Sequence, residues 1–227
     1  MNETLAPVNA VIIAATVLVS LGGLRSSDFL ERFLFAPRPI LGEGEYYRLV
    51  TSGFLHADWA HLFFNMYSLY SFGAPIERAF GAATFIAIYF SGIIGGNLVS
   101  LFLHRNEDYR ALGASGGVCG VIFAAIFLIP GGMVYVFPIP AAVPSPVYAI
   151  LFIFISFFGI RSGAGRVGHD AHLGGAIIGL LVATGIRPSI VSESRILYAL
   201  VMGISFVLFI YLYLAYRRPV SRAGRRW

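Results

Sequence analysis

Residues 113–120 read GASGGVCG and begin one apolar stretch, and residues 169–175 read HDAHLGG and begin another. A nucleophile-type residue, Ser115, and a base-type residue, His172, therefore each stand at the head of an apolar segment of the kind that enters a membrane. Polar groups buried in a membrane are costly and usually functional. A serine and a histidine held at the same depth in a bilayer predict hydrolysis of peptide bonds within the membrane.

The composition is that of a polytopic membrane protein. Of 227 residues, 58% are hydrophobic and only 12% are charged, and the mean hydropathy is +0.80. Soluble domains carry about 25% charged residues, so the composition argues against a water-soluble core. The net charge of +5 comes from sixteen arginines without any lysine. We interpret these arginines as membrane-flanking anchors, because no soluble basic patch with interleaved aromatic residues is present for nucleic acid to bind.

A spanning helix needs roughly 20 mostly apolar residues, and seven stretches are candidates. They are Val8–Leu24, Trp59–Ile76, Ala82–Leu103, the shorter Ser115–Ile129, Pro146–Ile160, Ala171–Ile186 and Arg195–Tyr216. The long connector at 25–58 mixes charges with aromatic residues, so we expect a partly structured loop with amphipathic pieces at the membrane interface. The proline-rich connector at 129–145 predicts a turn-rich loop, and the glycine-rich connector at 161–168 predicts a mobile one.

Small residues should bring the fourth and sixth segments close together. Glycines stand four apart on each of them: Gly116 with Gly120, and Gly175 with Gly179. Such spacing gives each helix a smooth face and allows the two backbones to approach. With seven crossings the two segments run in the same direction, so Ser115 and His172 should lie near the same membrane face.

These residue types suit acyl transfer. A serine hydroxyl becomes a good nucleophile when a histidine takes its proton, and a helix N-terminus favours a nearby oxyanion. The flanking Gly113 and Gly116 allow a tight turn and close approach of a substrate. The alternatives are that Ser115 only caps its helix and that His172 is a core histidine. Asp170 faces away from His172 on a helix, so we expect it to be the N-cap and not a third catalytic residue.

The second segment offers hydrogen-bond donors for an oxyanion. His61 and Asn65 stand four residues apart and therefore share a helical face. They could instead be metal ligands, but no carboxylate or cysteine completes a zinc set. We expect no metal and no cofactor, because the serine, the histidine and these donors suffice for the reaction. Asp58 is expected to cap this helix, and His56 lies just outside it, where its role could be structural.

The motifs together resemble those of the rhomboid intramembrane serine proteases. They stand in family order: Tyr47-Arg48, the run from His56 through His61 to Asn65, Glu77-Arg78, Gly113-Ala114-Ser115-Gly116, and Ala171-His172-Leu173-Gly174-Gly175 with Gly179. The resemblance implies an all-α polytopic membrane protein with a six-helix rhomboid core at residues 1–190, including the long first loop. It implies a seventh transmembrane helix and a basic tail at residues 191–227.

The resemblance also implies roles. Ser115 would be the nucleophile and His172 the base of a dyad, with His61 and Asn65 holding the oxyanion. The implied activity is cleavage of the transmembrane helices of single-span membrane proteins in the lipid bilayer. A non-catalytic rhomboid-like protein that binds or escorts membrane clients is the main alternative, and a small transporter or channel is a third.

Further residues follow from the same resemblance. Arg48 would help to fix the first loop, Glu77 would brace a loop on the opposite side, and the connector at 161–168 would cap the active site. Two positions depart from the family pattern. Tyr47 replaces the usual tryptophan, and Cys119 replaces a tyrosine whose ring stacks on the catalytic histidine.

We expect a multi-pass integral protein of the plasma (inner) membrane of a prokaryote. Its orientation stays open, because two arguments disagree. If the first segment begins in the cytoplasm, as the resemblance implies, seven crossings put the arginine-rich tail at residues 217–227 outside. The tendency of positive charges to stay inside predicts the opposite.

Overall fold

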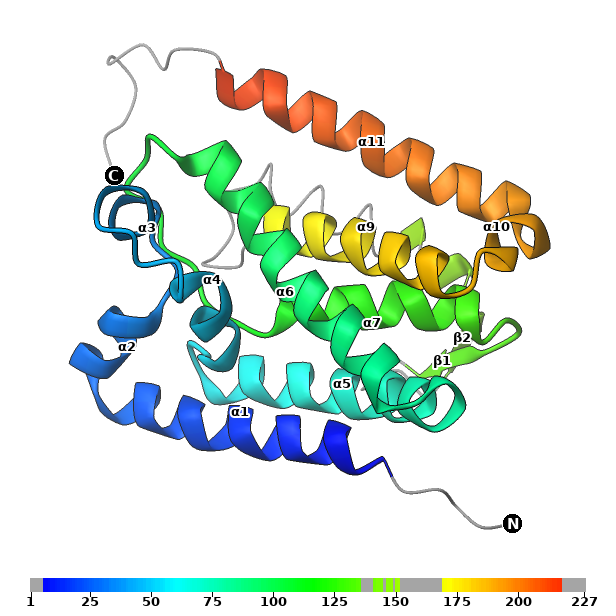
Figure 1. Ribbon diagram of the computed structural model, residues 1–227, viewed down its shortest axis with the longest axis horizontal. Helices are drawn as coiled ribbons and strands as arrows, with labels where there is room; N and C mark the ends of the chain where they lie inside the picture. Colours follow the sequence, from blue (N-terminus) through cyan, green and yellow to red (C-terminus); the bar gives the residue numbers. More distant parts are fainter. Residues whose placement is uncertain (1–5, 136–140, 145, 149, 152–168, 218–227) are drawn as a thin grey trace.

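The computed structural model describes residues 6–135, 141–144, 146–148, 150–151 and 169–217. Its elements, in chain order, are α1 (Pro7–Arg25), α2 (Ser27–Phe33), α3 (Pro37–Gly42), α4 (Arg48–Thr51), the 3-10 helix η1 (Ser52–Phe54), α5 (Trp59–Phe80), α6 (Ala82–His104), α7 (Ser115–Leu128), β1 (Met133–Tyr135), β2 (Ala142–Pro144), α9 (His169–Ile186), α10 (Ser189–Glu193) and α11 (Arg195–Arg217). In Figure 1, α6, α7 and α9 lie between α1 along one edge and α11 along the other.

The all-α polytopic membrane fold is confirmed. Among the described residues, three helical stretches are long and apolar enough to cross a membrane, namely Pro7–Arg25, Ala82–His104 and Arg195–Leu214. Two shorter apolar helices, Ser115–Leu128 and Asp170–Ile186, accompany them. The predicted fifth segment at 146–160 lies largely outside the described residues. The count of seven crossings, and the division at residue 190, therefore stay predictions.

The short helix α7 is the centre of the bundle. Every residue from Gly116 to Leu128 is buried, because α6 and α9 pack against the helix and α5 covers it as well. A helix that is apolar on all sides is expected in such a position. Its 14 residues span about 21 Å at 1.5 Å per residue, which is less than the roughly 30 Å hydrocarbon core. One end of α7 must therefore lie inside the membrane depth.

Glycines allow α7 and α9 to approach as the sequence predicts. A Cβ atom added to Gly175 would overlap the backbone carbonyl of Gly116, and one added to Gly179 would overlap the backbone of Gly120. Closer to the start of α9, a Cβ atom added to Gly96 of α6 would overlap the carbonyl of Ala171. The three helices therefore meet at backbone contact, which only residues without a side chain permit.

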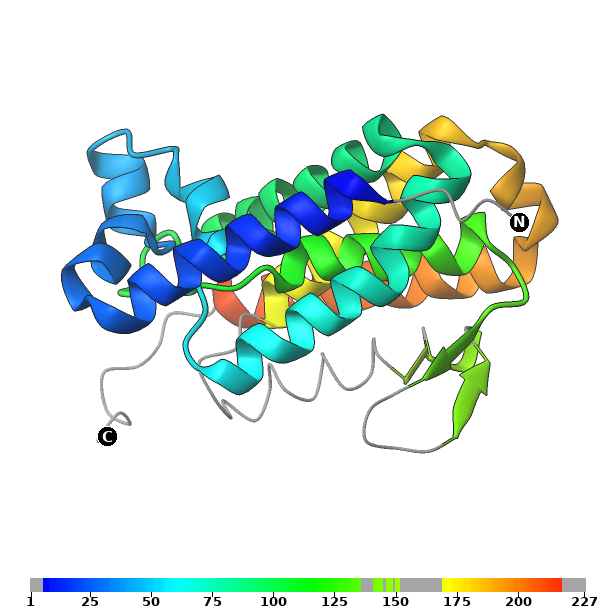
Figure 2. The ribbon, with the colours of Figure 1, turned by 90° about the horizontal axis from the view of Figure 1, so that it is seen from below.

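The two connectors differ in structure. Residues 25–58 form short helices α2, α3, α4 and η1, which agrees with the predicted partly structured loop. Phe35 and Ala111 exchange backbone hydrogen bonds of 2.9 and 3.1 Å, so this loop is tied to the connection between α6 and α7. The described parts of the 129–145 connector pair as an antiparallel ribbon of β1 and β2, with Val134 opposite Val143. Figure 2 shows this ribbon on the outside of the helices.

Candidate active site

The structure brings Ser115 and His172 together. The Nε2 atom of His172 lies 2.7 Å from the Oγ atom of Ser115, although the two residues begin different helices. Ser115 is the first residue of α7, and Ala114 occupies the N-cap position without a side-chain capping bond. The interpretation of Ser115 as a simple helix cap is therefore wrong, since its hydroxyl faces the histidine.

The backbone before Ser115 is held on both sides. Gly113 donates its N–H to the carbonyl of Ser52, at 2.9 Å, and Ala114 donates its N–H to Nε2 of His56, at 3.4 Å. Gly113 has a φ of +133°, which L side chains rarely adopt. A Cβ atom there would lie 2.8 Å from the Cε1 atom of His61 and 3.7 Å from Oγ of Ser115. Glycine is thus required where the His61 ring and the Ser115 hydroxyl converge.

His56 has a larger part than its position in the sequence suggests. It is fully buried, and its Nδ1 atom lies 2.9 Å from Oγ of Ser20. Ser20 donates its hydroxyl hydrogen to the carbonyl of Phe54, and Nε2 of His56 accepts from Ala114, so Nδ1 must carry the hydrogen and the ring is neutral. Burial away from water lowers the pKa of His56 to about 3. The ring also packs edge-on against His61, at 4.9 Å between centroids.

We expect His56 to make folding sensitive to acid. An unfolded histidine binds a proton below pH 6.5, whereas folded His56 does so only near pH 3. The contribution of His56 to the free energy of unfolding is therefore fully present above pH 6.5. Below pH 6.5 the free energy of unfolding should fall by about 1.4 kcal/mol per pH unit. Thermal unfolding in detergent at pH 7 and pH 5 checks this against His56→Asn, which cannot titrate. Equal losses in the two proteins would contradict the assignment.

The predicted oxyanion donors His61 and Asn65 both lie on α5. The His61 ring adjoins Gly113, as described above, and Asp58 caps α5 by accepting the N–H of His61, at 2.7 Å. The capping prediction for Asp58 is confirmed. Asn65 is buried, and its Nδ2 atom donates to the carbonyl of His61, at 3.0 Å. The use of either side chain to bind an oxyanion stays a prediction.

Asp170 does not have the predicted position. Helix α9 begins at His169, so Asp170 lies inside its first turn and is not the N-cap. Its buried carboxylate accepts a hydrogen bond from the hydroxyl of Tyr109, at 3.2 Å, and lies 3.4 Å from Nε2 of His104. The prediction was wrong because these partners come from the end of α6 and the loop beyond it, which no local pattern reveals.

Arg48 cross-links the first loop. Its NH1 group donates to the carbonyls of Glu31 and Leu34, both at 2.8 Å, and its Nε atom donates to the carboxylate of Glu45 at 2.5 Å. The guanidinium also lowers the pKa of Glu45. The buried Arg48 side chain thus holds the backbone at the end of α2 against the start of α4, as a residue that fixes this loop would do.

Glu77 braces the start of a helix, whereas the sequence had suggested a loop. Its two carboxylate oxygens accept the N–H groups of Val8 and Asn9, at 3.0 and 2.7 Å. These N–H groups belong to the first turn of α1, where they have no partner within the helix. The carboxylate therefore caps α1 and also satisfies the positive end of its dipole.

The remaining predictions have separate outcomes. Cys119 is buried one turn after Ser115, in an apolar setting where a thiol is usually inert. Tyr47 donates its hydroxyl to the carbonyl of Arg32, at 3.3 Å. The connector at 161–168 lies outside the described residues. Within the described part of the chain, no cluster of three histidine, cysteine or acidic side chains could hold a metal ion.

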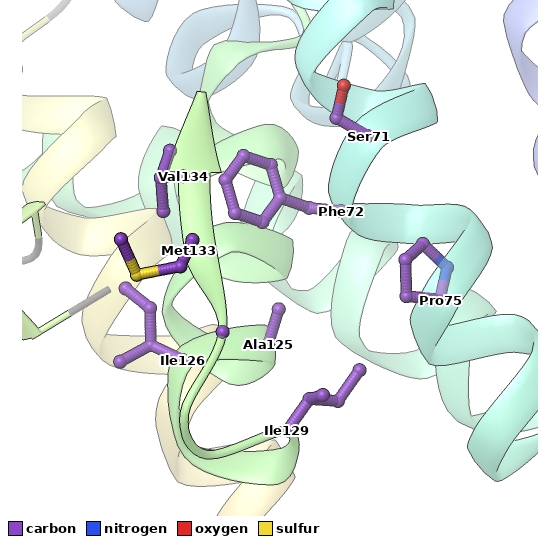
Figure 3. A pocket seen from close by; sticks show the side chains of 9 residues that line it. Ser71, Phe72, Pro75, Ala125, Ile126, Ile129, Met133 and Val134 are labelled. Atoms are coloured by element: carbon purple, nitrogen blue, oxygen red, sulfur yellow. The ribbon is translucent and has the colours of Figure 1, made fainter. Parts of the chain in front are cut away.

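An apolar cavity lies apart from this site. It has a volume of about 120 Å³ and is lined by residues of α5, α7 and the β1 strand, among them Phe72, Ala125 and Val134. Figure 3 shows these side chains around the space. The hydroxyl of Ser71 bonds to the carbonyl of Tyr67 in its own helix. None of the predicted site residues lines the cavity, so it offers no chemistry to the dyad.

Comparison with known proteins finds several rhomboid relatives. RHOMBOID-like protein 12, mitochondrial, of Arabidopsis thaliana is 33% identical over 161 residues, which are 63% of this chain and 47% of that protein. Rhomboid protease GluP of Bacillus subtilis is 28% identical over 166 residues, 73% of this chain and 31% of that protein. Rhomboid protease AarA of Providencia stuartii is 27% identical over 198 residues, 75% of this chain and 67% of that protein.

The match thus spans less than half the length of the first two relatives. The family model described as Rhomboid domain matches residues 43–189. That range is more than half of the chain and contains both Ser115 and His172, together with the residues predicted to support them. The chain therefore belongs to the rhomboid family.

Proposed function

We propose that this chain is an intramembrane serine endopeptidase that cleaves the transmembrane helices of single-span membrane proteins. The observation that carries the proposal is the 2.7 Å contact between Oγ of Ser115 and Nε2 of His172. A serine and a base within hydrogen-bond reach are the signature of an activated nucleophile. A rhomboid-like protein that only escorts clients has no need of this contact, and the relatives named as proteases favour the catalytic alternative.

In the proposed reaction, Nε2 of His172 takes the proton of the Ser115 hydroxyl as Oγ attacks the scissile carbonyl carbon. The carbonyl oxygen becomes an oxyanion, which the N–H of Ser115 and the side chains of His61 and Asn65 stabilise. Collapse of this intermediate breaks the peptide bond, and His172 gives the proton to the leaving amine. Water then attacks the acyl-serine with the same base, which releases the acid and restores Ser115. These residues supply each step without a cofactor.

The position of Ser115 supports a substrate in the bilayer. Because α7 is shorter than the hydrocarbon core, and its neighbours bury it, a peptide bond must reach Ser115 at the level where α7 begins. A helical substrate hides its carbonyls in internal hydrogen bonds, so it must unwind locally before attack. Substrates whose transmembrane helix contains glycine or proline near the scissile bond should unwind at lower cost.

The membrane and its sidedness also belong to the proposal. The bacterial relatives support the plasma (inner) membrane of a prokaryote as the location of this chain. The relative named as mitochondrial is compatible instead with a mitochondrial membrane. The family resemblance favours an active site near the outer face. Accessibility of a single cysteine placed beside Ser115, in a Cys119→Ser background, would report the side from which water enters.

Cleavage in liposomes tests the proposal. The purified chain is reconstituted with two single-span substrates, one with a glycine-proline pair in its transmembrane segment and one with leucines there. We expect cleavage of the first, at a bond inside the membrane, and at least about tenfold slower cleavage of the second, since helix unwinding costs about 3 kcal/mol less at a proline. Stable binding of several substrates without cleavage would instead favour the client-binding function.

A further inference from the structure

A buried polar cluster joins the start of α9 to the end of α6. His104, the last residue of α6, lies 2.8 Å through Nδ1 from the carboxylate of Glu107 and 3.4 Å through Nε2 from the carboxylate of Asp170. Its ring stacks on Tyr109 with 3.8 Å between centroids and 3° between planes. The Tyr109 hydroxyl donates to the other oxygen of Asp170, at 3.2 Å. The side chains of His104 and Asp170 are almost fully buried.

This cluster lies on both chain segments that deliver the dyad. Asp170 is two residues before His172 in the first turn of α9. Tyr109 belongs to the connection that runs from α6 into Ser115, and that connection is fixed in turn by the paired backbone of Phe35 and Ala111. The cluster therefore couples the segment that carries the base to the segment that carries the nucleophile.

The glycine backbone contacts between the helices set their separation but not their position along the axis. Around the dyad, α9 touches its neighbours through the glycine backbones described above, with the carbonyl of Ala171 against Gly96 and Gly175 against Gly116. The glycine positions themselves carry no side chain that would interlock two helices, although Ile178 packs over Gly95 and Val99 packs over Gly174 between α6 and α9. A hydrogen bond is directional and loses strength within an ångström of displacement. Among the described contacts near the start of α9, the hydrogen bond from Tyr109 to Asp170 and the 3.4 Å contact of Asp170 with His104 therefore resist sliding, in addition to the dyad contact itself.

We propose that Asp170, held by His104 and Tyr109, is a positioning residue that fixes the height of α9 and so sets the contact of His172 with Ser115. Its carboxylate touches neither reacting atom and acts only through the position of the helix. The role in catalysis rests on the proposed function, whereas the geometric role does not. Displacements of about 1 Å can cost about 10²-fold in rate, so the loss of the Asp170 carboxylate should have a large effect on catalysis.

Nuclear magnetic resonance tests the geometry without reference to activity. The chain has five histidines, so ring-¹⁵N labelling gives few signals, and the His172 signal is the one lost in His172→Gln. Ser115→Ala gives the position of that signal when the dyad contact is absent. We expect Asp170→Asn to move the His172 signal toward the Ser115→Ala position. A His172 signal that keeps its native position while that of His104 moves would overturn the proposal.

Kinetics give a second, independent readout. In liposomes, Asp170→Asn should lower kcat by about tenfold or more with KM within about twofold, because orientation and not substrate binding is lost. Tyr109→Phe removes only one hydroxyl and should show the same pattern with a smaller loss. Asp108→Asn is the matched control, since Asp108 is an exposed acid in the same connection, and its kcat should stay native.

The two proposals fail in different ways. If Ser115→Ala still cleaves substrate, the proposed function fails, and the His172 signal of Asp170→Asn still decides whether Asp170 positions the helix. If Ser115→Ala is silent while Asp170→Asn keeps native kcat and a native His172 signal, the protease stands and the positioning role is overturned. A raised KM with unchanged kcat would also overturn it, because that pattern indicates lost substrate binding.

Discussion

Alanine in place of Ser115 or His172 should lower the rate of substrate cleavage by at least about 10⁴-fold, the scale seen when a serine hydrolase loses its nucleophile or base. Ser115→Ala removes the atom that forms the acyl intermediate, and His172→Ala removes the acceptor 2.7 Å from it. Initial rates in liposomes, with each variant checked for native thermal unfolding in detergent, measure the effect. Ser192→Ala is the control, because that exposed hydroxyl only bonds to the carbonyl of Ser189.

The double variant adds a sharper test of the dyad. If the two residues act as a unit, Ser115→Ala combined with His172→Ala should be no slower than either single variant. Covalent labelling by a fluorophosphonate, which reacts only with an activated serine, should disappear in both single variants. Substantial cleavage by Ser115→Ala, or losses that multiply in the double variant, would show that the two side chains do not share one step.

Gly175→Ala should nearly abolish activity although it adds only one methyl group and changes neither dyad side chain. The new Cβ atom would overlap the carbonyl of Gly116, which is backbone and cannot rotate away. Helices α7 and α9 must separate, and His172 moves away from Ser115 with its helix. We expect at least a 10²-fold loss of kcat, as for a displacement of about 1 Å, and a loss of about 1–3 kcal/mol in unfolding free energy from overpacking.

A matched control lies on the same helix. Gly185 of α9 has nothing within 4 Å of an added Cβ atom, so Gly185→Ala should keep native activity and gain about 0.5–1 kcal/mol from better helix propensity. Activity assays and unfolding in detergent compare the two variants directly. Native activity in Gly175→Ala would mean that the backbone contact of α7 with α9 does not set the distance between the dyad atoms.

Several features were readable from the sequence because their causes are local. The apolar stretches predicted the bounds of α1, α6, α7 and α11 to within one or two residues, since burial of apolar side chains in a membrane requires continuous segments. Asp58 was identifiable as a cap because an aspartate before an apolar run has one obvious set of N–H groups to bind. Glycines four apart on the fourth and sixth segments predicted the close contact of α7 with α9.

Other features depended on partners that are remote in sequence. Asp170 also stands at the head of an apolar run, and the same local rule predicted a cap there. The rule failed because His104 and Tyr109 bind the carboxylate from another helix and its loop. The roles of His56 and Glu77 were equally hidden, since one binds Ser20 and Ala114 and the other caps α1.

The sequence by itself determined that this chain is a bundle of apolar helices with a serine and a histidine at the heads of two of them. Those conclusions follow from the apolar stretches and the residues that begin them, which are local features of the sequence. Only the tertiary structure decided that the two side chains meet at 2.7 Å, and that the Asp170 carboxylate contacts Tyr109 and His104 and does not cap α9. The physical reason is that hydrogen bonds depend on distances of a few tenths of an ångström, and only the packing of distant helix faces sets such distances.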